Sequence, residues 1–416
     1  MKFEQYHISD DIKHNLARLG FVRPTDIQFK AIPSILNGED VLAVAQTGTG
    51  KTAAFAIPVI DTIHRYKSSK RSYGIKCIVL APTRELAVQI GGVFESLARH
   101  TRVKVFTLHG GVEQDAQISK LQDGIDVLIA TPGRMFDLIN QQVIRLQSVS
   151  TLVLDEADHM LDLGFIEDIR YIKKMLTRAH QTLFFSATIN DDIRKLAYSQ
   201  VKSAAIRIQV SPKDRISKNV SHFVMFVEQD DKRIFLERFL TDHPDDKVIV
   251  FVRTRVRAER AGKAMQRAGF AVLALHGDMP QEDRQVAMQD FRNDACRILI
   301  ATDVSARGID VPDVQFVINY DLPEKAENYV HRVGRTGRGE KKGEAISFCS
   351  EAEKPLLEAI ETFISKPVEV LDVSKKGYAE VLETAKRAEM DLKSLVAEHD
   401  AWMSGSGRKK KKRKRG

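Results

Sequence analysis

The chain has 416 residues and a formal net charge of +8, from 64 Lys and Arg against 56 Asp and Glu. Eight of the basic residues form the last run, Arg408–Arg415, so the rest of the chain is balanced in charge. This balance excludes nucleic acid binding through a positive field over the whole body and leaves local patches and backbone groups. No stretch approaches the roughly 18 apolar residues of a membrane span. Residues 1–13 lack the apolar centre of a signal peptide, so we expect a cytoplasmic protein with no membrane partner.

Short apolar runs alternate with helical patterns along the chain, which is typical of a parallel sheet in an α/β fold. In the first half we expect strands at residues 41–45, 77–80, 103–108, 127–130, 151–154 and 183–185. The alternation lapses over a polar stretch at 210–219, which we interpret as a linker. It then resumes with strands at 248–252, 272–275, 298–301, 314–318 and 345–348, and with a helix at 256–268. The sequence therefore predicts two α/β domains, as the length also favours.

Beyond residue 367 the strand patterns stop. Residues 378–397 carry apolar side chains at helical spacing and predict an amphipathic helix that docks on the second domain. A Ser/Gly linker at 403–407 precedes the basic run, which we expect to be disordered. The expected divisions are a first domain at 1–209, a linker at 210–219, a second domain at 220–366, a helical extension and linker at 367–407, and a basic tail at 408–416.

The run Ala45-Gln46-Thr47-Gly48-Thr49-Gly50-Lys51-Thr52 lies between a predicted strand and a predicted helix. Its glycines let backbone N–H groups turn toward a phosphate, and the helix N-terminus adds its positive end. Lys51 is placed to reach the β- and γ-phosphates, and Thr52 to ligate magnesium. The second half of the chain has no such loop. We therefore expect one nucleoside triphosphate site, completed by the second domain.

Two carboxylates follow the predicted strand at 151–154, within Asp155-Glu156-Ala157-Asp158. Ligands of open α/β sheets collect at the carboxyl ends of the strands, so this segment and the phosphate loop should meet. We expect Asp155 to hold magnesium and Glu156 to position and deprotonate the attacking water. Alone, the tetrapeptide favours an ordinary acidic turn; beside the phosphate loop, the catalytic interpretation is favoured.

Further short segments surround these two in a fixed order. They are Gly20–Gln28, Pro82–Ala87, Gly110-Gly111, Thr131–Arg134, Ser186–Thr188, Phe251–Thr254, His276-Gly277 with Gln281 and Arg284, Ala301–Val304, Ala306–Asp310 and His331–Arg338. Over residues 1–365 the whole set resembles the DEAD-box family of ATP-dependent RNA helicases, and most closely its bacterial RhlE-type branch. The resemblance implies two tandem RecA-like parallel-sheet domains with a cleft between them, plus a short helical and basic C-terminal extension.

The resemblance implies that the segment before the phosphate loop, the Q motif, recognises adenine. The amide of Gln28 offers a donor and an acceptor to the base, and Phe21 offers a stacking face; taken alone, the segment favours a simple Pro-Thr turn. Asp310 is implied to contact the ribose or to couple the nucleotide to closure. The expected nucleotide-binding residues are Phe21, Arg23, Gln28, Gln46, Thr47, Gly48, Thr49, Gly50, Lys51, Thr52 and Asp310.

An RNA groove is implied in each domain, because small residues and helix-start N–H groups let a sugar–phosphate backbone approach. Each of these segments alone is more often a structural turn. The expected RNA contacts are Pro82, Thr83, Arg84, Gly110, Gly111, Thr131, Arg134, Arg253, Gln281, Arg284, Thr302 and Asp303. Contact with phosphates and 2′-hydroxyls predicts little sequence preference.

Arg335 and Arg338 are implied to be arginine fingers that reach the γ-phosphate from a strand–helix junction. Ser186, Thr188 and His331 are implied to couple the ATP site to RNA. Two residues depart from the family pattern: Ser305, where Ala is usual, and His159, where Arg is common in the branch. We expect the first to be tolerated and neither to touch a proposed catalytic atom.

Together these residues predict a monomeric RNA-stimulated ATPase that uses ATP and Mg²⁺ to unwind or remodel local RNA duplexes and RNA–protein complexes. Ribosomal precursors and the mRNA-decay machinery are its expected partners. An ATP-gated RNA clamp with slow turnover shares every residue named and is the alternative. A DNA-translocating helicase is disfavoured by the Q motif together with Asp-Glu-Ala-Asp. The basic tail is either a tether for RNA or a charged run that aids solubility.

Overall fold

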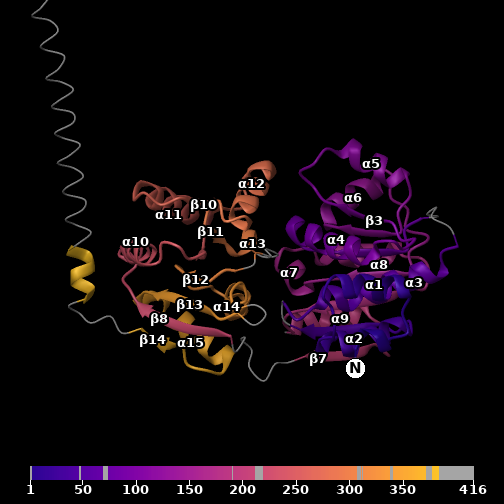
Figure 1. Cartoon of the computed structure of the whole chain (residues 1–416), viewed down its shortest axis with the longest axis horizontal. Helices are drawn as coiled ribbons and strands as arrows, with labels where there is room; N and C mark the ends of the chain where they lie inside the picture. Colours follow the sequence, from indigo (N-terminus) through magenta and orange to yellow (C-terminus); the bar gives the residue numbers. More distant parts are fainter. Residues whose placement is uncertain are drawn as a thin grey trace, which may run out of the picture. The chain divides into compact units, whose positions relative to one another are not determined.

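The computed structural model describes residues 2–45, 48–68, 74–189, 191–210, 219–306, 311, 313–337, 341–371 and 377–383, with the backbone alone at 281 and 304 (Figure 1). The main division of the chain into two compact units falls between residues 218 and 219. Each unit is a domain built on one seven-stranded parallel sheet.

The first domain orders its strands β3-β4-β2-β5-β6-β1-β7. The strands are β1 (Val41–Ala45), β2 (Cys77–Leu80), β3 (Val105–Leu108), β4 (Val127–Ala130), β5 (Thr151–Leu154), β6 (Gln181–Ser186) and β7 (Ile206–Val210). The helices are η1 (Phe3–Gln5), α1 (Asp10–Arg18), α2 (Asp26–Leu36), α3 (Lys51–Tyr66), α4 (Arg84–Ala98), α5 (Gln114–Gln122), α6 (Pro132–Asn140), α7 (Ala157–Asp162), α8 (Ile166–Met175) and α9 (Asp191–Gln200).

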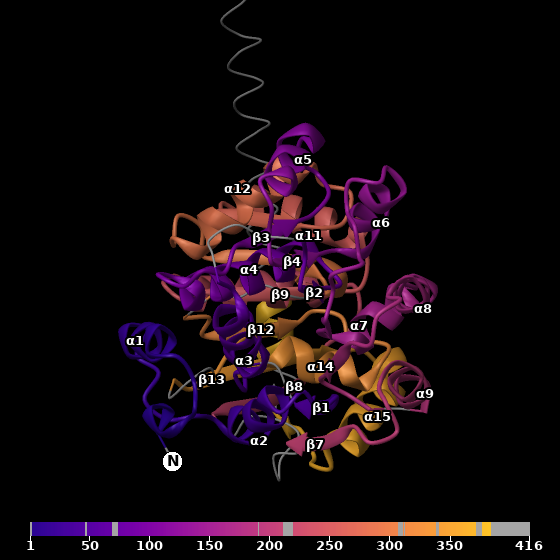
Figure 2. The ribbon, with the colours of Figure 1, turned by 90° about the vertical axis from the view of Figure 1, so that its right-hand side faces the viewer.

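Helices cover both faces of this sheet, which is why β2 and β4 are uninterrupted apolar runs rather than alternating ones. One hydrophobic cluster packs α1 to α4 against the sheet, and a second packs α6 to α9 against the other face. Figure 2 shows α1 on one side of this domain and α8 and α9 on the other. The site loops are therefore carried on a sheet buried from both sides.

The second domain orders its strands β10-β11-β9-β12-β13-β8-β14. The strands are β8 (Val220–Phe226), β9 (Val248–Val252), β10 (Val272–Leu275), β11 (Ile298–Thr302), β12 (Phe316–Asn319), β13 (Gly343–Cys349) and β14 (Glu369–Val370). The helices are α10 (Lys232–Asp242), α11 (Arg255–Arg267), α12 (Gln281–Arg292), α13 (Asp303–Ala306), α14 (Ala326–Val333), η2 (Glu351–Glu353) and α15 (Lys354–Ile364).

The predicted strands all occur, with bounds that match or shift by a few residues. Strands β7, β8 and β14 were not predicted individually. β14 is a two-residue edge strand beyond residue 367, held by parallel pairing with β8, and so short a run carries no periodic signal. The predicted linker lies almost entirely outside the described residues. The predicted domain bounds remain predictions.

The segment after β14 confirms part of the predicted C-terminal helix. Residues 377–383 are helical, and Tyr378 and Val381 pack against the hydrophobic cluster of the second domain. The Tyr378 ring lies 4.7 Å from that of Phe235, and its hydroxyl donates to Asp231 Oδ2 at 2.7 Å. The remainder of that helix and the basic tail lie outside the described residues. Among the helices that the structure describes, none is both long enough and apolar enough to cross a membrane.

Candidate functional site

The carboxyl edge of the first sheet carries two groups of predicted site residues. Strands β5, β6 and β1 lead into Asp155, Ser186 and the phosphate loop, and strands β3, β4 and β2 lead into Gly110, Thr131 and Pro82. The strand order places β3, β4 and β2 on one side of β5, β6 and β1. The predicted RNA contacts therefore occupy one half of this edge and the predicted ATP contacts the other half, as expected for ligand loops of an open parallel sheet.

Gly50 ends the phosphate loop with a φ of +89°, a left-handed conformation that glycine adopts freely. A Cβ atom at this position would collide with the amide nitrogen of Gln28. Gln28 is 1% exposed, donates from Nε2 to the Gly50 carbonyl at 3.1 Å, and accepts from the Thr25 N–H at 3.0 Å. The amide predicted to recognise adenine is thus fixed directly on the phosphate loop, and its second N–H takes no part in these two bonds. Phe21 packs edge-on against Phe3 nearby.

Lys51 and Asp155 are buried and oppositely charged. Lys51 is 6% exposed, and its Nζ has no hydrogen-bond partner among the described residues. Asp155 is 3% exposed, and burial raises the pKa of its carboxyl to about 6 although the Lys51 ammonium acts to lower it. A buried ammonium without a partner fits a phosphate, and a desolvated carboxylate at the end of β5 fits a metal cation. Thr52, the other predicted magnesium ligand, is partly buried on the first turn of α3.

Glu156 has a φ of +50°, a left-handed conformation that costs a non-glycine residue about 1 kcal/mol or more. This sharp turn separates β5 from α7 and brings His159 against the carboxylate, with Nδ1 3.6 Å from Glu156 Oε2. The expectation that His159 touches no proposed catalytic atom is therefore wrong. The imidazole is 2% exposed, and neither of its nitrogens has a hydrogen-bond partner among the described residues.

Asp158 joins the acidic motif to the end of β6. Its Oδ2 accepts from the Thr188 N–H at 3.0 Å and from the Thr188 hydroxyl at 2.9 Å. Ser186 Oγ donates to the Thr188 carbonyl at 2.7 Å, which closes the turn on itself. The structure thus places the two predicted coupling residues of this domain within one or two hydrogen bonds of the acidic motif.

Side chains tie together the RNA-side loops of the first domain. Arg84 lies against Gly110, where a Cβ atom would approach its guanidinium within 3.0 Å. Arg134 donates to the Val112 carbonyl and to Gln117 Oε1, each at 3.1 Å. These bonds link the loops after β2, β3 and β4 into one surface. Thr83 caps α4 by accepting from Leu86, Thr131 stands at the N-cap of α6, and Gly111 has a φ of +80°.

The carboxyl edge of the second sheet gathers Arg253, Thr302 and Asp303 after neighbouring strands β9 and β11. The fully buried Ser305 donates from Oγ to the Leu275 carbonyl at 2.8 Å and accepts from the Thr302 N–H at 3.2 Å. Arg284 donates to the Ser305 carbonyl at 3.1 Å. A hydroxyl is therefore accommodated at position 305 because it has partners, which agrees with the expected tolerance.

Arg332 was not singled out from the sequence, yet it is the best-anchored arginine of its motif. It is 2% exposed and donates to both carboxylate oxygens of Asp303, at 2.5 and 2.8 Å. Arg335 lies in the turn after α14, so its prediction at a strand–helix junction is wrong. Its Nε donates to the His331 carbonyl at 3.2 Å, one helical turn back. No sequence pattern separates a structural arginine from a finger in a run this rich in arginine.

Several predicted residues lie outside what the structure describes. They are Gln46, Thr47, Asp310, Arg338 and the side chain of Gln281. Of the remaining nucleotide-binding residues, Arg23 and Gly48 are exposed and Thr49 is partly buried.

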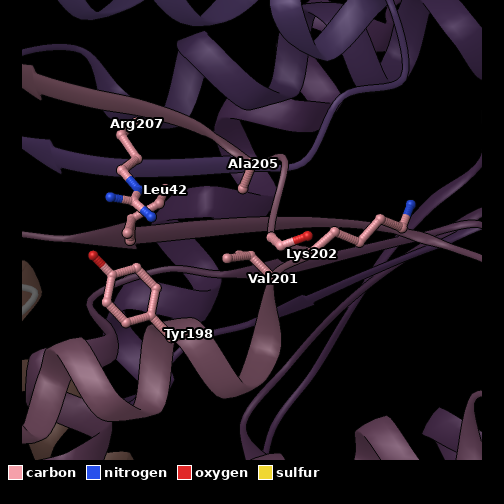
Figure 3. A pocket seen from close by; sticks show the side chains of 7 residues that line it. Leu42, Tyr198, Val201, Lys202, Ala205 and Arg207 are labelled. Carbon is pink, nitrogen blue, oxygen red and sulfur yellow. The ribbon is translucent and has the colours of Figure 1, made fainter.

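A separate pocket of about 280 Å³ lies between the end of α9 and the start of β7 (Figure 3). It is lined by Leu42, Tyr198, Val201, Lys202, Ser203, Ala205 and Arg207. The Arg207 guanidinium lies over the Tyr198 ring at 4.9 Å from its centre. Because this pocket is near the amino ends of β1 and β7 and includes none of the predicted site residues, it is not the nucleotide site.

The phosphate loop follows β1, and the acidic motif follows β5, which is separated from β1 in the sheet by β6. The second domain has the same strand order. Together these features define a two-domain nucleoside triphosphatase of the helicase type. Two family models match the chain: the DEAD/DEAH box helicase over residues 25–196 and the helicase conserved C-terminal domain over residues 231–340. The matched ranges include β1 to β6 of the first sheet and β9 to β12 of the second.

Relatives and solved structures agree with this class. The DEAD-box ATP-dependent RNA helicase CshA of Bacillus cereus is 39% identical over 370 residues, which are 89% of this chain and 69% of that protein. The ATP-dependent RNA helicase RhlB of Shewanella oneidensis is 39% identical over 375 residues, 89% of this chain and 85% of that protein. Dbp5 of S. cerevisiae, solved with RNA and ADP BeF3, is 30% identical with a TM-score of 0.82, covering 93% of this chain and 99% of that one.

The chain therefore belongs to the DEAD-box family of ATP-dependent RNA helicases, enzymes that hydrolyse ATP. A structure of Mss116p bound to ssRNA and AMP-PNP, 28% identical with a TM-score of 0.81 over 92% of this chain and 81% of that one, has the same fold. ATP and RNA are thus the ligands of this class of protein. Membership of the RhlE-type branch stays a prediction.

Proposed function

We propose that this protein hydrolyses ATP when single-stranded RNA is bound, and uses the cycle to open short RNA duplexes or to remodel RNA–protein complexes. The observation that carries the proposal is the Asp158–Thr188 pair, with bonds of 2.9 and 3.0 Å between the acidic motif and the end of β6. A change in charge at the acidic motif acts directly on this pair. ATP chemistry and RNA contact are thereby joined through one sheet edge.

On the ATP side, each proposed role follows from a group's chemistry and surroundings. Lys51 binds the β- and γ-phosphates with its unpartnered, buried ammonium. Thr52 and Asp155 would hold Mg²⁺, which supplies charge neutralisation at the phosphates. Glu156 orients the attacking water and accepts its proton, and Gln28 with Phe21 recognises the base. Arg335 and Arg338 stay the proposed fingers.

On the RNA side, contact is proposed through the loops after β2, β3 and β4 and through Arg253, Arg284, Thr302 and Asp303 of the second domain. Apart from the Asp303 carboxylate, which Arg332 holds, these are backbone groups, hydroxyls and arginines, which suit phosphates and 2′-hydroxyls rather than base edges. We therefore propose binding with little sequence preference. A monomeric state, a cytoplasmic location, and partners among ribosomal precursors or the mRNA-decay machinery stay predictions.

Steady-state ATP hydrolysis with and without single-stranded RNA tests the proposal, with Glu156→Gln as the variant. The change keeps the size of the side chain and removes its capacity to accept a proton. We expect stimulation by RNA in the wild type and its loss in the variant, with ATP binding retained. Equal stimulation by DNA of the same length would contradict RNA specificity.

The alternative is an ATP-gated RNA clamp that turns over slowly. The left-handed Glu156 and its contact with His159 are the features that favour it, because an imidazole 3.6 Å away competes with water for the carboxylate. His159→Leu, which removes both imidazole nitrogens and still fills the buried site, separates the two. Faster turnover with unchanged RNA affinity supports the clamp, and unchanged turnover supports the helicase.

A further inference from the structure

A buried charge cluster that was not predicted from the sequence occupies the carboxyl edge of the second sheet. Lys232 is the first residue of α10 and is 0% exposed. Its Nζ donates to Glu353 Oε2 at 2.5 Å and to the Tyr320 carbonyl at 2.8 Å, and lies 3.9 Å from Asp321 Oδ1. Asp321 is also 0% exposed, and Glu353 is 4% exposed.

Glu353 is held from several sides. Besides Lys232, its carboxylate accepts from the Ser350 N–H at 3.1 Å, the Ser350 hydroxyl at 2.9 Å and the Leu322 N–H at 3.1 Å. Burial acts to raise the pKa of Glu353, but the Lys232 ammonium and the Ser350 donors hold it below its usual value. The carboxylate is therefore ionised and fixed in one orientation.

Further bonds of the cluster go to Arg257, whose Nη1 donates to Asp321 Oδ1, and to Arg253, a proposed RNA contact. The Arg253 N–H donates to Asp321 Oδ2 at 2.9 Å, which fixes its backbone. Its Nη2 donates to Glu353 Oε1 and to the Leu322 carbonyl, each at 3.3 Å, which fixes one corner of the guanidinium. The side chain remains 34% exposed, and its Nε lies 3.9 Å from the exposed carboxylate of Glu324.

We propose that Lys232 and Glu353 are positioning residues that orient Arg253 for an RNA phosphate. The inference rests on the proposed function, in which Arg253 contacts RNA. A guanidinium held at one corner presents its other N–H groups in a defined direction, and such a contact loses less side-chain entropy when phosphate binds. A buried ion pair is by itself weak evidence of added stability. Without the Lys232 ammonium, Arg253 would be the remaining ion-pair partner of the buried Glu353 carboxylate, which would draw the guanidinium inward.

Asp321 extends the same cluster to a second proposed RNA contact. Its carbonyl accepts from Arg332 Nη1 at 2.6 Å, and Arg332 in turn holds both oxygens of Asp303. The loops after β9 and β11 are therefore joined through buried bonds that the sequence motifs do not reveal.

The test compares RNA affinity in two charge-neutralised ion pairs of the same domain. Lys232→Met/Glu353→Gln removes the proposed positioning pair. Lys247→Met/Asp294→Asn removes a pair of 2.6 Å at the amino edge of the same sheet, where Lys247 is also buried. The dissociation constant for a fluorescent single-stranded RNA is measured by anisotropy with a non-hydrolysable ATP analogue, and thermal unfolding is recorded for every variant.

We expect the Lys232/Glu353 variant to bind RNA about tenfold more weakly and the Lys247/Asp294 variant to bind it as the wild type does. In an Arg253→Ala background, the Lys232/Glu353 change should cost no further affinity, because its effect acts through that arginine. The KM for ATP without RNA should not move in either. An equal loss in both pairs, or a loss that adds to that of Arg253→Ala, would overturn the positioning role.

Two single variants, Glu353→Gln and Arg253→Ala, test the proposal independently of the double variant. If the double variant does not fold, Glu353→Gln alone retains the hydrogen-bonding shape and should still weaken RNA binding severalfold; unchanged binding overturns the proposal. If Arg253→Ala alone has no effect on RNA binding, Arg253 is not an RNA contact and the inference fails. The proposed function fails separately, if RNA does not stimulate ATP hydrolysis by the wild type.

Discussion

The two domains use the same strand order and differ in the surroundings of the residue that begins the first helix after their first strand. If the strands of each domain are counted from its own first strand, both sheets read 3-4-2-5-6-1-7. Strand β1 leads into α3, which begins at Lys51, and β8 leads into α10, which begins at Lys232. The same topological position therefore carries a buried lysine in both domains.

The surroundings of these lysines differ in one respect. Lys51 Nζ has no hydrogen-bond partner among the described residues, whereas Lys232 Nζ is bonded to Glu353. Glu353 accepts from backbone N–H groups and a hydroxyl, the kinds of donor that bind a phosphate elsewhere. We therefore propose that Lys51 binds an anionic ligand, whereas Lys232 is paired with a carboxylate of the chain itself. A lysine at the same topological position can thus bind a ligand in one domain and position a neighbouring side chain in the other.

Changing each lysine to Met is the strongest way to break this comparison. Lys51→Met removes no hydrogen bond among the described residues, so we expect the first domain to lose much less stability than the second does in Lys232→Met, while ATP hydrolysis falls by about 100-fold or more. Lys232→Met strands the Glu353 charge in the interior, and breaking a buried pair in this way costs about 3–5 kcal/mol of unfolding free energy. Denaturant unfolding and ATPase rates measure the two effects.

The matched control is Lys195→Met, an exposed residue whose Nζ lies 3.9 Å from the Asp192 carboxylate. It should change neither unfolding nor hydrolysis. Equal destabilisation by Lys51→Met and Lys232→Met would contradict the proposed difference between the two lysines.

Lowering the pH should destabilise the second domain more than the first, because of His222. This residue lies in β8, whereas β1, the corresponding strand of the first domain, has only apolar residues. Burial lowers the pKa of His222 to about 4, with the Lys366 charge adding to the effect, and Nδ1 lies 3.1 Å from the Tyr329 hydroxyl. Because the folded pKa is depressed, the associated stability is complete above the unfolded pKa. As the pH falls from about 6.5 to 4, up to about 3 kcal/mol is lost.

The measurement is the unfolding midpoint of wild type and His222→Gln between pH 7 and pH 4, followed by a probe in each domain. The variant should lose less stability than the wild type over this range. A parallel pH dependence in the two proteins would show that His222 does not titrate on unfolding.

The sequence was sufficient for the elements and the ligand loops, because both depend on local patterns. Continuous apolar runs located β2, β4 and β9, and the phosphate loop and acidic motif followed from their spacing to such strands. The sequence was insufficient for Lys232, Asp321 and Glu353, since a lone Lys or Glu near a helix start reads as a solvated cap. Their burial arises only when loops after three different strands meet. The left-handed Glu156, and with it the approach of His159, also required the tertiary fold.

Coupling is proposed for the turn after β6 in the first domain and not for its counterpart in the second domain. The turn after β6 binds the acidic motif through Thr188, while the turn after β13, its counterpart, binds Glu353 through Ser350. Thr188→Val keeps the shape and removes the hydroxyl bond to Asp158. We expect RNA-stimulated ATPase within about twofold of wild type and duplex unwinding about tenfold slower. Thr241→Val, whose hydroxyl bonds only within α10, is the control; equal slowing of both activities would argue against coupling.

The smallest expected difference concerns the hydrogen bond that holds one loop at the carboxyl edge of each sheet. After β4, Arg134 donates to the Val112 carbonyl, and after β11, Ser305 donates to the Leu275 carbonyl. Arg134 is partly exposed and Ser305 is fully buried. Ser305→Ala leaves the Leu275 carbonyl unsatisfied and should cost about 1 kcal/mol of unfolding free energy with little change in RNA affinity. Arg134→Ala should do the reverse, because water replaces its hydrogen bonds while the loop proposed to contact RNA loosens. Unfolding curves and RNA titrations of the two variants, measured side by side, would show whether the Ser305 bond contributes mainly to stability and the Arg134 bonds mainly to RNA binding.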